Sequence, residues 1–189
     1  MPETMQDITP DAFLAPEHII RSFDLKPGDH VADFGVGHGH FVIALSRAVG
    51  GDGKVYAIDI QKSALDIVEN RAKLEHLWNI ETIRGDVEMP RGSKLKDRFV
   101  DFVLAANILF QIEERAALFA EARRILVQNG RFAVIEWDET PSSLGPPIAS
   151  RIKKEAIKQL AASAGFAFDR ECSAGSHHYG LLFVNRYTT

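Results

Sequence analysis

The sequence has a single cysteine, Cys172, among its 189 residues. One thiol cannot close an intrachain disulfide, and it excludes a metal site built from several thiolates. Long apolar runs are missing too, since none approaches the roughly 18 residues that a membrane span needs. The first ten residues, MPETMQDITP, are acidic and lack the apolar core of a secretory signal. These absences predict a cytoplasmic chain with no membrane span.

A strong charge of one sign is also absent, because the formal net charge is only −4. No overall basic field would draw the chain to nucleic acid or to a membrane. Repeats and low-complexity tracts are not found either, and an apolar share of 46% is ordinary for a globular protein. We expect a single domain over residues 1–189, with residues 1–15 as a loose N-terminal arm.

Strand and helix signals alternate along the chain, which is typical of an α/β domain with a mostly parallel sheet. Strands are expected at residues 30–34, 54–60, 80–84, 99–105, 131–137, 166–172 and 179–185. Helices are expected at residues 16–23, from 63 onward, 113–127 and 153–164. Another follows the first strand, with Phe41, Leu45 and Val49 on one face and a break at Gly50. Residues 63–66 fit a capping box, and Asn129 with Gly130 fits a helix C-cap. The last two strands form a hairpin.

A glycine-rich loop, residues 31–39, lies where the first strand becomes a helix. Glycines let the backbone approach a ligand closely, and the N–H groups of the following helix attract negative charge. Asp59 ends the second strand, where a carboxylate can hydrogen-bond a ribose diol. The loop and this acid together predict an adenosine-containing cofactor.

The spacing of the loop distinguishes between two cofactor classes. A dinucleotide fold has G-x-G-x-x-G/A, but the sixth residue counted from Gly35 is the bulky His40. The pattern here is D-x-G-x-G-x-G, with Asp33 two residues before the first glycine. That acid would repel a pyrophosphate, whereas it suits the ammonium group of a methionine moiety. A dinucleotide-binding domain remains the alternative.

These motifs resemble those of class I S-adenosylmethionine (SAM)-dependent methyltransferases, most closely the small-molecule type 11 branch. The resemblance covers about residues 16–186, and its motifs are residues 33–39, 55–59, 85–86, 99–103, 126–131 (without the usual proline) and 164–166. It implies a doubly wound, Rossmann-like seven-stranded sheet of order 3-2-1-4-5-7-6 with strand 7 antiparallel. It implies SAM as cofactor and S-adenosylhomocysteine as product. The implied cofactor-binding residues are Asp33, Gly35, Gly37, Gly39, Asp59, Ile60, Asp86, Val87 and Asn107.

The acceptor side carries no motif that identifies a substrate. The terminal hairpin is expected to return at the rim of the pocket and to bring His177, His178 and Tyr179 there as catalytic candidates, with Glu136 behind them. The alternative is that both histidines are simply exposed. The proline-rich loop 138–150, with Arg151 after it, is expected to act as a lid. His38 and His40 are assigned to packing or to the pocket wall rather than to a metal, because no third ligand has recognisable spacing.

Three functions are compatible with these features. The first is a methyltransferase acting on a small molecule by in-line displacement. The second is a methyltransferase acting on RNA or protein, docked through basic stretches at residues 91–98 and 151–158. The third is a non-catalytic SAM-binding module. The acidic net charge favours the first, so nucleic acid is not expected as a partner, and a second subunit in a homodimer could supply the cover of the site.

Overall fold

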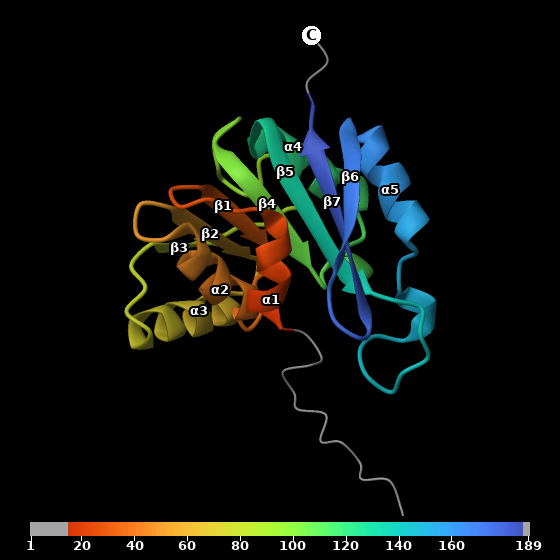
Figure 1. The fold of residues 1–189 in the computed structure, drawn as a ribbon, viewed down its shortest axis with the longest axis horizontal. Helices are drawn as coiled ribbons and strands as arrows, with labels where there is room; N and C mark the ends of the chain where they lie inside the picture. The colour runs from red at the N-terminus through yellow and green to blue at the C-terminus, as the bar shows by residue number, and fades with distance from the viewer. Residues whose placement is uncertain (1–14, 187–189) are drawn as a thin grey trace, which may run out of the picture.

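The computed structural model describes residues 15–186. Its strands form one sheet of order β3-β2-β1-β4-β5-β7-β6 (Figure 1). The strands are β1 (His30–Phe34), β2 (Lys54–Asp59), β3 (Ile80–Arg84), β4 (Val100–Ala106), β5 (Leu126–Trp137), β6 (Phe166–Ser173) and β7 (His178–Asn185). Only β7 runs antiparallel to its neighbours. The predicted doubly wound sheet with its antiparallel seventh strand is confirmed.

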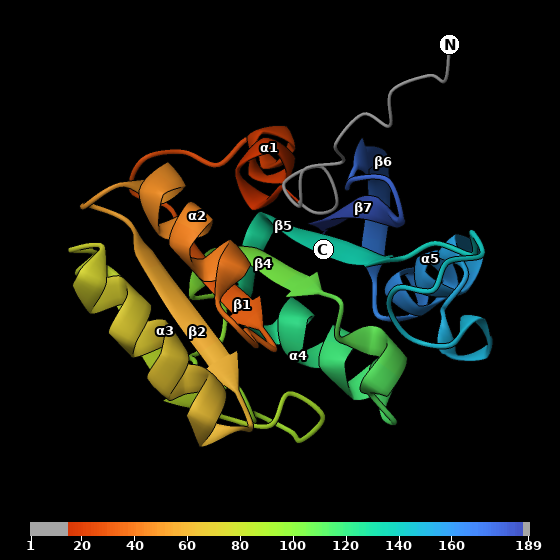
Figure 2. The ribbon, with the colours of Figure 1, turned by 90° about the horizontal axis from the view of Figure 1, so that it is seen from below.

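Helices cover both faces of this sheet (Figure 2). They are α1 (Pro16–Ile20), α2 (His40–Val49), α3 (Lys62–Leu74), α4 (Arg115–Ile125) and α5 (Lys154–Ser163), with short 3₁₀ turns η2 (Arg21–Phe23), η3 (Leu109–Gln111) and η4 (Ile148–Ser150). The first three helices and the last two pack on opposite faces, each over its own apolar core. None of the helices between residues 15 and 186 is long and apolar enough to cross a membrane. The predicted N-terminal arm, apart from Ala15, lies outside the described residues.

Two local predictions are wrong. Helix α3 begins at Lys62 with Gln61 as its N-cap, and no side chain caps it, so residues 63–66 are not a capping box. Helix α4 ends at Ile125, and the chain enters β5 at once with Leu126 in extended conformation. Asn129 and Gly130 therefore do not cap a helix. They lie where the pairing between β4 and β5 is interrupted by a bulge, and Asn129 takes a φ of 62° there.

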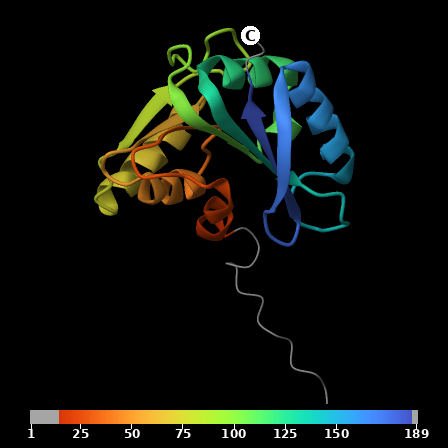
Figure 3. The ribbon, with the colours of Figure 1, turned by 45° about the horizontal axis from the view of Figure 1, so that its top comes forward.

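Three hydrogen bonds extend the sheet pairing by one residue past the carboxyl ends of β1, β3 and β4. Gly35 N–H donates to Ile58 O at 2.8 Å, and Gly85 N–H donates to Asp59 O at 3.1 Å. On the other side, Asn107 N–H donates to Ile135 O at 2.8 Å. The β6–β7 turn and the loop after β5 lie together farther along this edge of the sheet (Figure 3).

Candidate functional site

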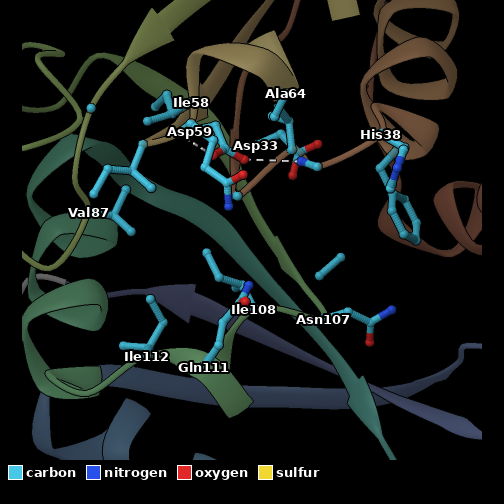
Figure 4. Close-up of a pocket in the computed structure, with 18 of the residues that line it drawn as sticks. Asp33, His38, Ile58, Asp59, Ala64, Val87, Asn107, Ile108, Gln111 and Ile112 are labelled. Atoms are coloured by element: carbon cyan, nitrogen blue, oxygen red, sulfur yellow. Dashed lines mark hydrogen bonds between the residues drawn. The ribbon is translucent and has the colours of Figure 1, made fainter. Parts of the chain in front are cut away.

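A cavity of about 600 Å³ lies at the carboxyl ends of β1, β2, β3 and β4 (Figure 4). Eight of the nine residues predicted to bind the cofactor line it: Asp33, Gly35, Gly37, Asp59, Ile60, Asp86, Val87 and Asn107. The ninth, Gly39, does not. It is the N-cap of α2 with a φ of 74°, and a Cβ there would lie 2.8 Å from Val68 Cγ2. Gly39 therefore allows α2 and α3 to pack closely.

The other two loop glycines meet the cavity in different ways. At Gly35, with a φ of 73°, a Cβ would lie 2.3 Å from Ile108 Cδ1, so the loop touches the turn after β4. At Gly37, with a φ of 49°, a Cβ would meet no atom within 4 Å and would stand in open space. A residue with a side chain at Gly37 would project where a ligand could lie against the backbone.

Asp59 is held facing the glycine loop. Its Oδ2 accepts the N–H of Gly37 at 3.1 Å, and its Oδ1 accepts the N–H of Gln61 at 2.8 Å. The second bond also helps to start α3, a role that the sequence had assigned to Ser63. One carboxylate therefore joins the end of β2 to both the loop and the helix, while it remains on the cavity wall.

Asp33 lies on the cavity wall but is only 3% exposed. Burial, together with the nearby charge of Asp59, raises the pKa of the Asp33 carboxyl to about 7. A buried acid next to another acid is stabilised by a cation. The ammonium group of SAM would supply that charge, so the residues of this cavity fit the cofactor that the sequence implied.

Asp86 serves the turn after β3 and also faces the cavity. Its Oδ1 accepts the N–H of Glu88 at 3.0 Å, which is an ordinary turn contact for aspartate. Glu88 in turn accepts the N–H groups of Glu113 and Glu114 through Oε2, at 3.0 and 2.8 Å. These bonds hold the β3 end of the cavity against the start of α4.

The three predicted catalytic residues lie away from this cavity. None of His177, His178 and Tyr179 lines it. The Tyr179 hydroxyl donates to Ile152 O, and burial, then the charge of Glu136, raises the pKa of this phenol. The His178 ring lies 4.2 Å from that of Trp137, and burial lowers its pKa to about 4. His178 and Tyr179 are buried on β7 beside β5, and His177, in the turn before β7, is half-buried. Because none of the three lines the cavity, their catalytic role stays a prediction.

The loop after β5 is organised from within by Arg151. This buried guanidinium donates to four main-chain carbonyls of the loop, those of Asp138, Thr140, Leu144 and Pro146, at 2.8–3.0 Å. It also lies 5.5 Å from the Trp137 ring centroid. No residue of the loop lines the cavity. In the described structure the predicted lid packs beside the β6–β7 hairpin, where Asp138 N–H donates to His177 O.

Four cavity residues come from the segment after β4: Asn107, Ile108, Gln111 and Ile112. In Figure 4 they face Asp33 and Asp59 across the cavity. The sequence indicated only Asn107, because the others follow no motif, and η3 is too short to produce a helical pattern. His38 and His40 also line the cavity, as expected for wall residues.

The sequence matches a known protein family over the strands that border the cavity. A family model described as a methyltransferase domain, of type 11, matches residues 32–134, more than half of the chain. The chain belongs to this methyltransferase family. It is a class I SAM-dependent methyltransferase domain, and the matched span runs from β1 into β5, through every strand that borders the cavity.

Individual relatives agree with the family. A SAM-dependent methyltransferase from Aquifex aeolicus is 26% identical, with a TM-score of 0.85, over 94% of this methyltransferase and 93% of that chain. Demethylmenaquinone methyltransferases from Bacillus mycoides and Staphylococcus haemolyticus are 28% and 26% identical, over 67% and 65% of this chain. The chain spans about half the length of these curated relatives, 52% and 49%.

Proposed function

We propose that this methyltransferase transfers the methyl group of SAM to a small-molecule acceptor. The observation that carries the proposal is the cavity itself. At about 600 Å³ it has the volume of a small-molecule site, for which about 300–1,000 Å³ is usual. Its wall after β4 combines the apolar side chains of Ile108 and Ile112 with the amides of Asn107 and Gln111.

The cofactor is assigned to the β1–β3 part of the cavity. Asp33 would bind the ammonium group, Asp59 the ribose diol, and Asp86 the adenine amino group. Gly35 and Gly37 allow the loop to approach the methionine end, with Asn107 opposite. Ile60 and Val87 supply apolar surface for the adenine. These roles join the predicted motifs to side chains that share one cavity.

SAM supplies an electrophilic methyl group on a sulfonium, whose departure needs no acid from the protein. The contribution of the chain is therefore to orient the acceptor and to exclude water. Where the acceptor atom must lose a proton, the candidate bases are the imidazoles of His38 and His40, which line the cavity. Burial, then the charges of Arg71 and His38, lowers the pKa of His40, which keeps that imidazole neutral near pH 7. The proposal gives His177, His178 and Tyr179 no catalytic part.

The named relatives suggest which acceptor to test first. They are demethylmenaquinone methyltransferases, so a reduced naphthoquinone is a suitable probe for this chain. An apolar aromatic ring is compatible with the isoleucine side chains on the wall after β4.

The paired charges of the basic stretches argue against docking on RNA. Arg91 lies 2.9 Å from Asp97, and Lys154 and Lys158 lie 2.6 and 3.0 Å from Glu171. Arg151 is buried within its own loop. Phosphate binding would have to compete with these ion pairs.

A transfer assay with methyl-labelled SAM tests the proposal. The acceptors are a reduced naphthoquinone, a panel of small phenols and amines, total RNA and unfolded protein. We expect label in a small molecule, with an equal amount of S-adenosylhomocysteine formed. Label in RNA or protein alone would overturn the proposal. Binding of S-adenosylhomocysteine with no turnover on any acceptor would favour the non-catalytic module.

A further inference from the structure

The backbone of Leu109 is held on both sides, its N–H by Glu136 and its carbonyl by Arg115. Leu109 begins η3 and is fully buried. Its N–H donates to Glu136 Oε1 at 2.6 Å, and its carbonyl accepts from Arg115 Nε at 2.9 Å. Glu136 comes from the end of β5 and is 0% exposed, whereas Arg115 is the first residue of α4. The turn after β4 is thus fixed to two other elements by charge-assisted bonds.

This turn carries the wall of the cavity that faces the glycine loop (Figure 4). Ile108 precedes Leu109 and occupies the space that a side chain on Gly35 would need. Asn107 takes a φ of 54°, and its N–H donates to Ile135 O. Strand β5 therefore holds the turn twice, through the main chain of Ile135 and through the side chain of Glu136.

We propose that Glu136, supported by Arg115, is a positioning residue that sets where Ile108 and Asn107 stand relative to the glycine loop. Glu136 does not line the cavity, so it would act on cofactor and acceptor only through the Leu109 peptide. The inference rests on the proposed methyl transfer for its kinetic readout alone. Its structural readout is independent of any acceptor.

The ionisation of Glu136 makes this contact sensitive to pH. Burial raises its pKa to about 7, against the opposing effects of the N–H groups of Leu109, Trp137 and Ile108 and the charge of Arg115. Tyr179 faces it from β7, and its own pKa is raised, so that the phenol stays neutral. Glu136 Oε2 is buried and makes no hydrogen bond within residues 15–186. Because a carboxylate accepts an N–H bond more strongly than a neutral acid does, the hold on Leu109 should tighten as the pH rises.

Amide NMR of the whole ¹⁵N-labelled chain tests the contact directly. In the wild type, the Leu109 amide shift should titrate with a midpoint near 7 between about pH 5.5 and 8.5. In Glu136→Gln this titration should disappear, and the protection of the Leu109 amide from hydrogen exchange should fall about tenfold. Glu121→Gln is the matched control, since Glu121 is a buried carboxylate bonded to Ser93 and Arg124, away from the cavity. It should leave the Leu109 titration unchanged.

Kinetics then separate positioning from simple loss of fold. In Glu136→Gln we expect kcat to fall about tenfold and the pH profile to flatten, with a smaller change in the Kd of S-adenosylhomocysteine. A Leu109 amide that titrates in Glu136→Gln as in the wild type would overturn the proposal. So would a wild-type amide that does not titrate, a measurement that needs no variant to fold. If no acceptor turns over while the amide behaves as expected, the proposed function fails and this inference stands.

Discussion

The glycine-loop half of the sheet edge and the hairpin half use their polar groups in opposite ways. Around β1, β2 and β3, Asp33, Asp59 and Asp86 lie on the wall of a cavity. Around β5 and β7, the Tyr179 hydroxyl and the Arg151 guanidinium are bonded to main-chain carbonyls of the protein itself. Both halves are rich in polar residues, yet of these side chains only the three aspartates line the cavity.

The difference shows why rim position alone is a poor guide to catalysis. Both sets of residues lie in or next to the ends of strands at the same edge of the sheet. The hairpin, however, must also support a long loop after β5, and Arg151 and Tyr179 are committed to that loop. A side chain already satisfied by the backbone costs energy to redirect toward a substrate.

The largest loss of S-adenosylhomocysteine binding is expected from a side chain placed in the cavity. Gly37→Leu and Gly28→Leu both put a Cβ into open space at a positive φ, 49° and 92°, but only Gly37 lines the cavity. Both variants should lose similar stability, whereas only Gly37→Leu should lose the saturable heat of S-adenosylhomocysteine binding. Equal binding by the two variants in calorimetry would remove Gly37 from the site.

Removing the carboxylate of Asp59 should cause the next largest loss of S-adenosylhomocysteine binding. Asp59→Ala is expected to weaken S-adenosylhomocysteine binding by about 1.5–3 kcal/mol, the scale of hydrogen bonds to a charged group. Asp29→Ala is the control, because Asp29 also accepts a backbone N–H, from Lys26, but lies away from the cavity. An unchanged affinity in folded Asp59→Ala would show that this acid serves only the loop and α3.

The charge of Asp33 should appear as a pH dependence. Since its pKa is about 7 and the ionised form attracts an ammonium group, affinity for S-adenosylhomocysteine should rise about tenfold between about pH 6 and pH 8. Asp33→Asn should bind more weakly and with a flatter profile. A wild-type affinity that falls over this range would contradict the assignment.

The same shift has the opposite sign for the stability of the free protein. The folded-state pKa of Asp33 is about 7, above the ordinary value of 3.8. Its contribution to the free energy of unfolding is therefore complete below about pH 4 and is lost as the pH rises through 7. Glu136 contributes with the same sign. Thermal melts should therefore show a smaller loss of stability toward pH 8 in Asp33→Asn than in the wild type.

The smallest effect on binding is expected in the hairpin. Tyr179→Phe removes the bond to Ile152 O and should cost about 1 kcal/mol of stability. Both Tyr179→Phe and the double variant His177→Ala/His178→Ala should leave the affinity for S-adenosylhomocysteine unchanged. A tenfold loss of transfer activity in the double variant at unchanged stability, about 1.4 kcal/mol in barrier, would restore the histidines to catalysis.

How far the sequence predicts this molecule depends on the range of the interactions. The alternation of elements and the terminal hairpin follow from local patterns, and the sheet order follows from the resemblance. The acids at Asp33 and Asp59 were found because they stand at fixed spacings from the glycines. The capping predictions at Ser63 and Asn129 were wrong, because a capping motif is only a local signal. Helix α3 starts one residue earlier, at Lys62, and the chain continues from α4 directly into β5.

The acceptor side depends on contacts between residues far apart in the chain. The bond between Leu109 and Glu136 joins positions 27 residues apart, and that between Tyr179 and Ile152 joins another such pair. No spacing rule announces either contact. The sequence therefore indicated Asn107 but neither Gln111 nor Ile112. It also placed His177 and His178 at the cavity, whose lining contains neither of them.

The central claim is that the cavity at the glycine loop binds the cofactor of a methyltransferase, and calorimetric titration with S-adenosylhomocysteine and with NAD tests it most directly. We predict saturable binding of S-adenosylhomocysteine at a 1:1 ratio and no saturable heat with NAD, because Asp33 attracts an ammonium group and repels a pyrophosphate. Tighter binding of NAD than of S-adenosylhomocysteine would contradict the account.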